Sequence, residues 1–162
     1  MQKERHGDPD SRLILDGLRL LVRELRASSA AAERATGLSG AQLFVLRALA
    51  REPGLGVAAL AARTLTHQSS VSVVVAKLEE RGLVERVRAA DDARRLVLRP
   101  TAAGRRLGSG GPDPAQERLL AGLALLTPAT RRRLAADLAR WTAAIGLAGG
   151  APEMFFEAPR DG

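Results

Sequence analysis

The stretch Gln68-Ser-Ser-Val-Ser-Val-Val-Val-Ala-Lys-Leu-Glu-Glu-Arg-Gly82 decides the fold, because its residues suit either a strand or a helix. Its many β-branched residues and partial alternation favour a strand. Against this, four apolar residues are spaced as i, i+3, i+4 and i+7, which forms one face of a helix: Val71, Val74, Val75 and Leu78. Good helix formers follow, and glycine is a typical residue after a helix. We therefore predict a helix that stops at Gly82.

The residues on either side of this helix predict a helix, a turn, a helix and a hairpin in that order. A short helical run covers residues 57–64. Two strand-like runs follow the central helix, at residues 83–88 and 95–99. This is the order of a winged helix-turn-helix, a module that lays its second helix in the major groove of DNA. The predicted fold class is therefore mainly α with a small β-hairpin wing.

The face of the central helix opposite its apolar residues is polar. Gln and Ser side chains can hydrogen-bond to base edges or phosphates, and a valine methyl group can contact a thymine methyl group. An isolated amphipathic helix would more often turn such a face to solvent, but the flanking helix and hairpin favour DNA. The residues on this face are Gln68, Ser69, Ser72, Val73, Ala76, Lys77 and Glu80.

Four motifs of the predicted winged helix are those of a known family. They are Leu60-Ala-Ala-Arg63, Gln68-Ser-Ser-Val-Ser72, Lys77-Leu-Glu-Glu-Arg-Gly-Leu-Val-Glu-Arg86 and Asp91-Asp-Ala-Arg-Arg-Leu-Val-Leu-Arg-Pro-Thr-Ala-Ala-Gly104. Over residues 38–107 the chain resembles the MarR family of bacterial transcription regulators. The resemblance implies a homodimer with long N- and C-terminal dimerisation helices. It also implies a small-molecule effector, often an aromatic acid, bound between those helices and the DNA-binding part.

The resemblance also implies roles for residues of the wing. In the family a wing aspartate orients a wing-tip arginine that enters the minor groove, and the matching residues are Asp92 and Arg94, with Arg95 as an alternative to Arg94. His67 stands at the turn before the central helix, where it can contact a phosphate or be a plain surface residue. Val73 occupies a place where relatives often carry Arg, which shifts weight to phosphate contacts and DNA shape. The full set of expected DNA-binding residues is His67, Gln68, Ser69, Ser70, Ser72, Val73, Lys77, Arg88, Asp92, Arg94 and Arg95.

The rest of the chain is expected to form helices that pair two subunits. We assign residues 10–36 and 115–147 to a dimerisation region, residues 38–107 to the DNA-binding domain and residues 148–162 to a tail. A Gly- and Pro-rich stretch at residues 108–114 breaks what is often one long helix in the family. An ordinary core helix in a monomer is the alternative for residues 10–36. The apolar residues expected at the dimer interface are Leu18, Leu21, Leu25, Leu134, Leu138, Trp141 and Ile145.

Several local signals predict where elements begin and which side chains are buried. Ser39 and Gln42 form a capping box, and Thr127 with Pro128 is an N-cap followed by proline. Thr66-His67 is expected to be the turn and N-cap of the central helix, and Thr66 is the better capping residue by type. In the hairpin, four side chains are expected to face the protein: Leu83, Val87, Leu96 and Leu98.

Composition narrows the possible functions. The net charge is +7, and residues 57–107 hold ten Lys or Arg against five Asp or Glu, as expected of a surface that meets phosphates. There is no Cys and there are only two His, so we expect no metal and no cofactor. The sequence shows no signal peptide and no long apolar run, so we expect a cytoplasmic protein.

These observations favour a homodimeric, sequence-specific transcription regulator, with repression preferred over activation. Its operator would be pseudo-palindromic double-stranded DNA. An architectural or nonspecific DNA-binding protein is the alternative. An enzyme is disfavoured, because no catalytic set of side chains and no Gly-rich cofactor domain is recognisable. Arg131, Arg132 and Arg133 begin the last helix, where the helix dipole disfavours cations, and they face either solvent or an acidic partner.

The tail contains one apolar group, Met154-Phe155-Phe156, among Gly and Pro residues. Disorder is one expectation for such a composition. The other is capture of the three side chains by an apolar groove among the dimerisation helices, with loss of dimer stability but unchanged DNA preference when residues 149–162 are deleted. Burial of one Phe contributes roughly 1.5–3 kcal/mol, which favours capture.

Overall fold

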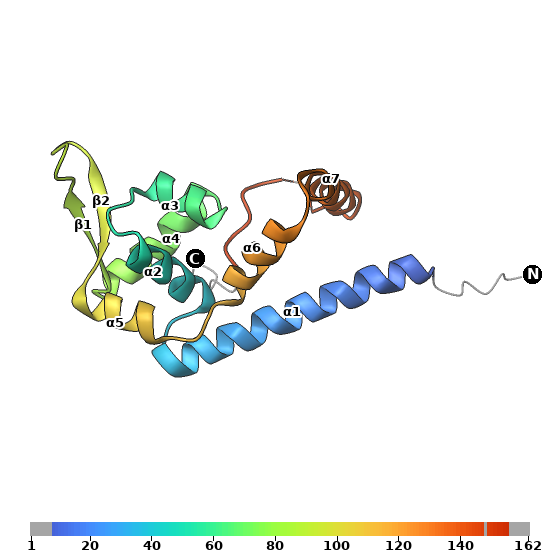
Figure 1. Cartoon of the computed structure of the whole chain (residues 1–162), viewed down its shortest axis with the longest axis horizontal. Coiled ribbons are helices and arrows are strands. Elements are labelled where there is room, and N and C mark those ends of the chain that lie inside the picture. Colours follow the sequence, from blue (N-terminus) through green and yellow to red (C-terminus); the bar gives the residue numbers. More distant parts are fainter. Residues whose placement is uncertain (1–7, 148, 156–162) are drawn as a thin grey trace, which may run out of the picture.

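A computed structural model describes residues 8–147 and 149–155 (Figure 1). The described residues form helices and one two-stranded sheet in the order α1 (Pro9–Thr36), α2 (Gly40–Arg51), α3 (Val57–Thr64), α4 (Gln68–Glu80), β1 (Val84–Arg88), β2 (Leu96–Pro100), α5 (Ala102–Gly110), α6 (Ala115–Leu125) and α7 (Pro128–Ala144). The mainly helical class with a small hairpin is therefore confirmed.

Helix α1 begins and ends at recognisable caps. The carboxylate of Asp8 accepts hydrogen bonds from the backbone N–H groups of Asp10 and Ser11, which have no partner inside the helix. A hydrogen bond from the Ser11 hydroxyl, followed by these backbone bonds, lowers the pKa of Asp8 below its ordinary value. Gly37 ends the helix in the left-handed conformation, with φ 67°.

The hydrophobic core surrounds α2. Ser39 and Gln42 form the expected capping box at its start, with distances of 3.1 and 3.2 Å between the bonded atoms. Leu43, Leu46 and Leu49 are completely buried, together with apolar residues of α3, α4 and the hairpin. Helix α2 is thus the central element on which the winged helix is assembled.

The helical interpretation of the central stretch is confirmed. Its four apolar residues, Val71, Val74, Val75 and Leu78, are completely buried on one face of α4. The N-cap falls within the expected Thr66-His67 pair, at His67 and not at Thr66, the better capping residue by type. His67 is the N-cap and its side chain makes no capping hydrogen bond, while the Thr66 hydroxyl lies 2.6 Å from the Thr64 hydroxyl. Thr66 therefore serves the turn between α3 and α4 rather than the start of α4.

The wing is an antiparallel hairpin in which Val84 pairs with Pro100 and Arg88 with Leu96. Leu83 and Leu98 are buried and Val87 is half-buried, as predicted, but Leu96 is 54% exposed. The prediction for Leu96 is wrong because this residue lies at the outer end of the hairpin, which projects away from the helices (Figure 1). Alternation places Leu96 on the same face of the strand as Leu98, but no helix among the described residues packs over that face at the outer end of the hairpin.

The break after the wing is confirmed at residues 111–114, whereas residues 108–110, which were expected within it, belong to α5. Helix α5 ends at Gly110 and α6 begins at Ala115, with Pro112 and Pro114 between them. Thr127 caps α7 by accepting a hydrogen bond of 3.2 Å from the N–H of Thr130. Helix α7 ends at Ala144, three residues before the expected end. All of α7 is described, and none of its residues is buried.

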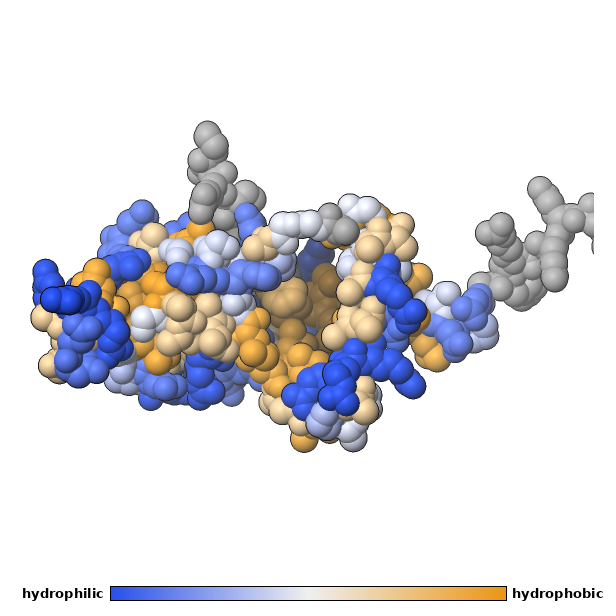
Figure 2. All heavy atoms as spheres, turned by 90° about the horizontal axis from the view of Figure 1, so that it is seen from above, coloured by the Kyte–Doolittle hydropathy of each residue, from blue (hydrophilic) through white to orange (hydrophobic). Residues whose placement is uncertain are grey.

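Helices α1, α6 and α7 together form what we call the helical arm. Figure 1 shows α1 running away from the winged helix, with α6 and α7 standing beside it. Figure 2 shows hydrophobic side chains exposed in the hollow between the winged helix and this arm. The arm therefore exposes apolar side chains next to the winged helix.

Candidate nucleic-acid interface

The outer face of α4 presents the polar side chains that the sequence predicted. Gln68, Ser69, Ala76 and Glu80 are exposed, and Ser72, Val73 and Lys77 are half-buried. His67 is exposed immediately before the helix. Small hydroxyl and amide side chains beside a single lysine give this face hydrogen-bonding capacity without bulk, which permits a close approach to a DNA groove.

Ser70 does not lie on this face. It is 9% exposed, and its hydroxyl donates a 2.8 Å hydrogen bond to the backbone carbonyl of Pro152. Ser70 is on the flank of α4, between the buried apolar face and the outer polar face. The sequence placed it among the DNA-binding residues because it stands inside the Gln68–Ser72 motif, but in the structure the chain's own C-terminal segment covers it.

The arrangement at the wing tip differs from the expected one. Asp92 accepts a 2.9 Å hydrogen bond from the backbone N–H of Arg94, so it shapes the turn and does not hold the guanidinium. The carboxylate that holds an arginine side chain is Asp91, whose Oδ1 lies 2.7 Å from Nη2 of Arg95. This hydrogen bond from Arg95 lowers the pKa of Asp91 below its ordinary value. Arg94 is exposed at the tip.

Two further arginines fix the wing in place. Arg88 donates from its guanidinium to the backbone carbonyl of Ala93, which closes the wing loop. Arg86 of β1 forms an ion pair with Glu79 of α4, with 2.9 Å between Nε and Oε1. Neither Asp91 nor the pair of Arg86 and Glu79 was predicted. Opposite charges four residues apart could have indicated Asp91 and Arg95, whereas the other pair depends on how the wing folds back onto α4.

Arg81 joins the end of α4 to the end of α1. Its guanidinium donates to the backbone carbonyl of Gly37 at 2.6 Å and to Oε1 of Gln42 at 3.4 Å. Gly37 is the residue at which α1 stops. The position of α4 is thus set from its C-terminal end by the helical arm and the start of α2.

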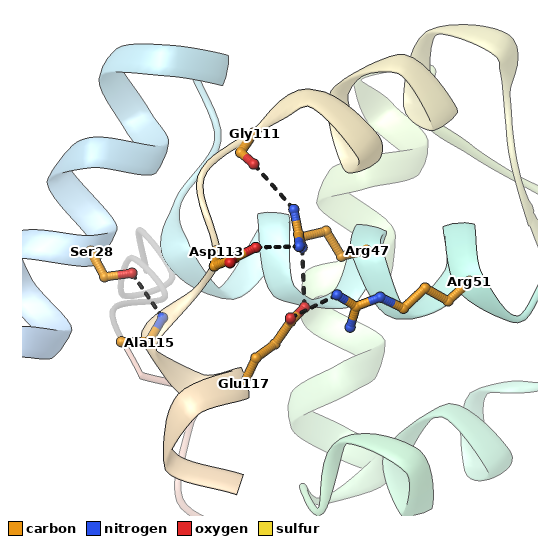
Figure 3. Close-up of polar contacts among 7 residues, drawn as sticks. All are labelled: Ser28, Arg47, Arg51, Gly111, Asp113, Ala115 and Glu117. Carbon is orange, nitrogen blue, oxygen red and sulfur yellow. Dashed lines mark hydrogen bonds and ion pairs between the residues drawn. The ribbon is translucent and has the colours of Figure 1, made fainter. Parts of the chain in front are cut away.

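A group of polar contacts joins the winged helix to α6 (Figure 3). We call it the junction: Ser28, Arg47, Arg51, Gly111, Asp113, Ala115 and Glu117. Arg47 of α2 is 12% exposed at its side chain and donates to Glu117 at 3.1 Å, to Asp113 at 2.5 Å and to the carbonyl of Gly111 at 3.1 Å. Arg51 lies 2.8 Å from Glu117, which raises the pKa of Arg51 above its ordinary value.

The junction also reaches α1. The N–H of Ala115 donates a 2.8 Å hydrogen bond to the Ser28 hydroxyl, and Arg118 pairs with Glu24 one turn away. A hollow of about 210 Å³ lies beside the two arginines of α2 and is lined by Arg47, Ala50, Arg51, Gly108 and Ser109. Polar contacts, rather than a continuous helix, therefore help to hold the arm against the winged helix.

Most residues expected at a dimer interface lie uncovered on the arm. Leu21, Leu134, Leu138 and Ile145 are 40–56% exposed, and Leu18 and Trp141 are half-buried. Leu25 differs, because it is 6% exposed and is already covered inside the single chain. An open groove of about 480 Å³ runs along α1 and is lined by Leu15, Leu18, Arg19, Val22, Arg23 and Arg26.

The chain has a helix-turn-helix followed by a hairpin wing, and this arrangement makes it a winged-helix protein. Residues 36–95 match the sequence model described as the MarR family. Members of this family are transcription regulators rather than enzymes. Among curated protein sequences, none matches the chain.

Solved structures of transcription regulators share the fold. The regulator BldR from Sulfolobus solfataricus is 22% identical, with a TM-score of 0.54 over 89% of this chain and 99% of that one. The regulator SlyA is 20% identical, with a TM-score of 0.54 over 82% and 93% of the two chains. MepR from S. aureus, solved in a complex with DNA, is 16% identical, with a TM-score of 0.50 over 86% and 99%. Among the described residues, no helix combines the length and apolar composition needed to span a membrane.

Proposed function

We propose that this protein is a homodimeric transcription regulator that binds a pseudo-palindromic operator in the cytoplasm and represses the genes beside it. The observation that carries the proposal is the polar outer face of α4, which stands uncovered beside an arginine-bearing wing. The surrounding stretch, residues 57–107, holds ten basic and five acidic side chains. Such an excess attracts phosphates and raises the rate of encounter with DNA.

In the proposed complex, α4 lies in the major groove and the wing reaches the backbone and the minor groove. Gln68, Ser69 and Ser72 contact base edges or phosphates, and Lys77 contacts a phosphate. Arg94 enters the minor groove, because Arg95 is engaged by Asp91. Asp92 orders the loop that carries Arg94. A minor-groove arginine reads groove width and potential rather than base identity.

The exposed apolar residues of the arm support a symmetric dimer. The apolar residues of α1 and α7 have helical spacing, and such a stripe is normally buried. Leu21 of α1 and Leu134 and Leu138 of α7 are nevertheless at least 40% exposed in the single chain. A second copy of the chain would cover both faces at once, and its symmetry would set two α4 helices about one turn of DNA apart. MepR from S. aureus, which shares this fold, has been solved bound to DNA.

We further propose that a small molecule binds between the arm and the winged helix and changes the spacing of the two α4 helices. A MepR-like protein of the same fold, 22% identical with a TM-score of 0.51, has been solved with pseudoligands. The junction supports such control, because ion pairs between side chains, rather than a continuous helix, join α6 to α2. A ligand acts on this equilibrium only through different affinities for the two arrangements.

The test compares the affinity of the protein for DNA from the promoter region of its own gene with its affinity for a random duplex of equal length at the same salt concentration. We expect at least tenfold tighter binding to a fragment of the promoter. The logarithm of the affinity should fall with the logarithm of the salt concentration with a slope of about −5 or steeper, since a dimer touches six or more phosphates. Sedimentation at micromolar concentration should show a dimer.

Equal affinity for both duplexes, with the same steep slope, would instead identify a nonspecific DNA-binding protein. A slope near zero would remove nucleic acid as the partner. A monomer at micromolar concentration would refute the dimer.

A further inference from the structure

The chain returns to the winged helix after α7. Gly149 and Gly150 have positive φ angles of 124° and 75°, which allow the backbone to reverse where other residues would be strained. The described segment that follows, residues 149–155, ends beside the core and not among the helices of the arm (Figure 1). We call it the strap.

The strap is anchored by Met154. This side chain is 6% exposed and belongs to the same core cluster as Phe44 of α2 and Val74 of α4. Methionine suits such a place, because its flexible thioether fills irregular gaps between packed side chains. The expectation that the apolar group of the tail lies among the dimerisation helices is therefore wrong for Met154. Phe155 is 56% exposed, and Phe156 lies outside the described residues.

A second contact joins the strap to the first turn of α4. The hydroxyl of Ser70 donates to the carbonyl of Pro152 at 2.8 Å, and Ser70 is 9% exposed. This turn has no side-chain cap of its own, because the N-cap residue His67 makes no capping hydrogen bond. The first turn of an uncapped helix frays readily, since its N–H groups lack partners. The bond from Ser70 ties that turn to a segment anchored in the core.

We propose that the strap positions the DNA-reading helix α4, with Ser70 as a positioning residue and not a DNA contact. The strap follows α7 along the chain, after residues 145–148, so it also connects the helical arm to the first turn of α4. Arg81 holds the other end of the same helix against the end of α1. Both ends of α4 are thus connected to the arm. The effect on DNA rests on the proposed function, whereas the link between Ser70 and the strap does not.

The experiment is a double-mutant cycle in the full chain between Ser70→Ala and Met154→Asp. The aspartate releases the strap, because a charge at this site would be buried without a partner. For DNA, we expect Ser70→Ala to weaken binding by roughly two- to tenfold, the range for one net hydrogen bond. In the Met154→Asp background the same change should have less than a twofold effect, because Ser70 has already lost its partner.

The opposite pattern would overturn the proposal. If Ser70→Ala weakens DNA binding equally in both backgrounds, Ser70 contacts DNA directly and the strap does not position α4. Met154→Ala is a milder second variant in case Met154→Asp does not fold, and Met154→Leu should restore wild-type affinity by refilling the gap. Phe155→Ala is the matched control, since this neighbouring side chain is exposed, and it should leave the affinity unchanged.

A readout that needs no DNA separates this proposal from the proposed function. Amide exchange at the first turn of α4 should speed up in Ser70→Ala and in Met154→Asp, and no further in the double variant. If the wild type does not bind DNA but exchange shows this coupling, the proposed function fails and the strap stands. Unchanged exchange in both single variants would refute the strap whatever the DNA result.

Discussion

Replacement of Gly104 by alanine should destabilise the fold, because the added methyl group has no room. Gly104 lies in the first turn of α5, where a Cβ atom would stand 2.0 Å from the backbone oxygen of Leu83 and 3.3 Å from Cδ1 of Leu46. Real Cβ atoms essentially never come within 3.0 Å of another atom outside their own bonds. Helix α5 or the start of the wing must therefore move by about 1 Å.

The surroundings oppose such a movement. The Leu83 oxygen accepts a 3.0 Å hydrogen bond from the N–H of Thr101, and the Leu83 N–H donates to Leu78 at 2.9 Å. The Thr101 hydroxyl accepts from Gly104 N–H at 3.1 Å and donates to the Gly82 carbonyl at 2.8 Å. These bonds hold α5, α4 and the hairpin together at one point, so a shift there breaks at least one of them.

The expected magnitude follows from three effects. Overpacking costs about 1–3 kcal/mol, and loss of one hydrogen bond costs about 0.5–1.5 kcal/mol. Better helix propensity of alanine returns about 1 kcal/mol. We expect Gly104→Ala to lower the free energy of unfolding by about 2 kcal/mol, measured by urea unfolding with circular dichroism.

Gly110 is the matched control, because it lies in the same helix and a Cβ there meets no atom within 4 Å. Gly110→Ala should leave stability unchanged or raise it by up to about 1 kcal/mol. A Gly104→Ala protein as stable as the wild type would refute the close approach of α5 to Leu83.

Three further predictions concern the wing, the arm and the junction. Arg94→Ala should weaken operator binding by about 1–3 kcal/mol and leave the fold and the dimer unchanged. The control Arg132→Ala on α7 should leave operator binding unchanged. Equal effects of the two substitutions in a binding titration would reject the wing-tip role of Arg94. Leu138→Glu should give a folded monomer in sedimentation, because Leu138 is 43% exposed in one chain and the proposed dimer interface would bury it. Ala136→Glu, on the opposite side of α7, should remain dimeric. A dimer in both variants would show that the interface does not include Leu138. Glu117→Gln should lower the free energy of unfolding by about 1–2 kcal/mol, since it leaves a mostly buried arginine partly unpaired, and an unaltered urea midpoint would show that the junction adds no stability.

The local features of this chain were predictable because they depend on residues close in sequence. Spacing of Val71 and Val75 identified α4, and the residues at Ser39 and Thr127 identified two helix starts. The exposure of Leu96 was not predictable, since alternation gives a face but not how far a hairpin extends beyond its cover.

The less predictable features join distant or chemically equivalent residues. Ser70 and Pro152 are 82 positions apart, and no periodicity connects them. Asp91 and Asp92 are adjacent and have the same side chain, so only the shape of the loop decides which one holds an arginine. The candidate DNA face could therefore be predicted, whereas the contacts that orient it could not.

The break between α5 and α6 gives the molecule a joint where a continuous helix would have given it a rod. A helical rod transmits a fixed angle, because every turn is bonded to the next along the backbone. At this joint, ion pairs of Arg47 and Arg51 with Glu117 help to hold the angle instead, and such pairs weaken as salt rises. Substitutions at these three side chains can therefore change the angle between the arm and the winged helix one at a time, without any change to the core or to the outer face of α4.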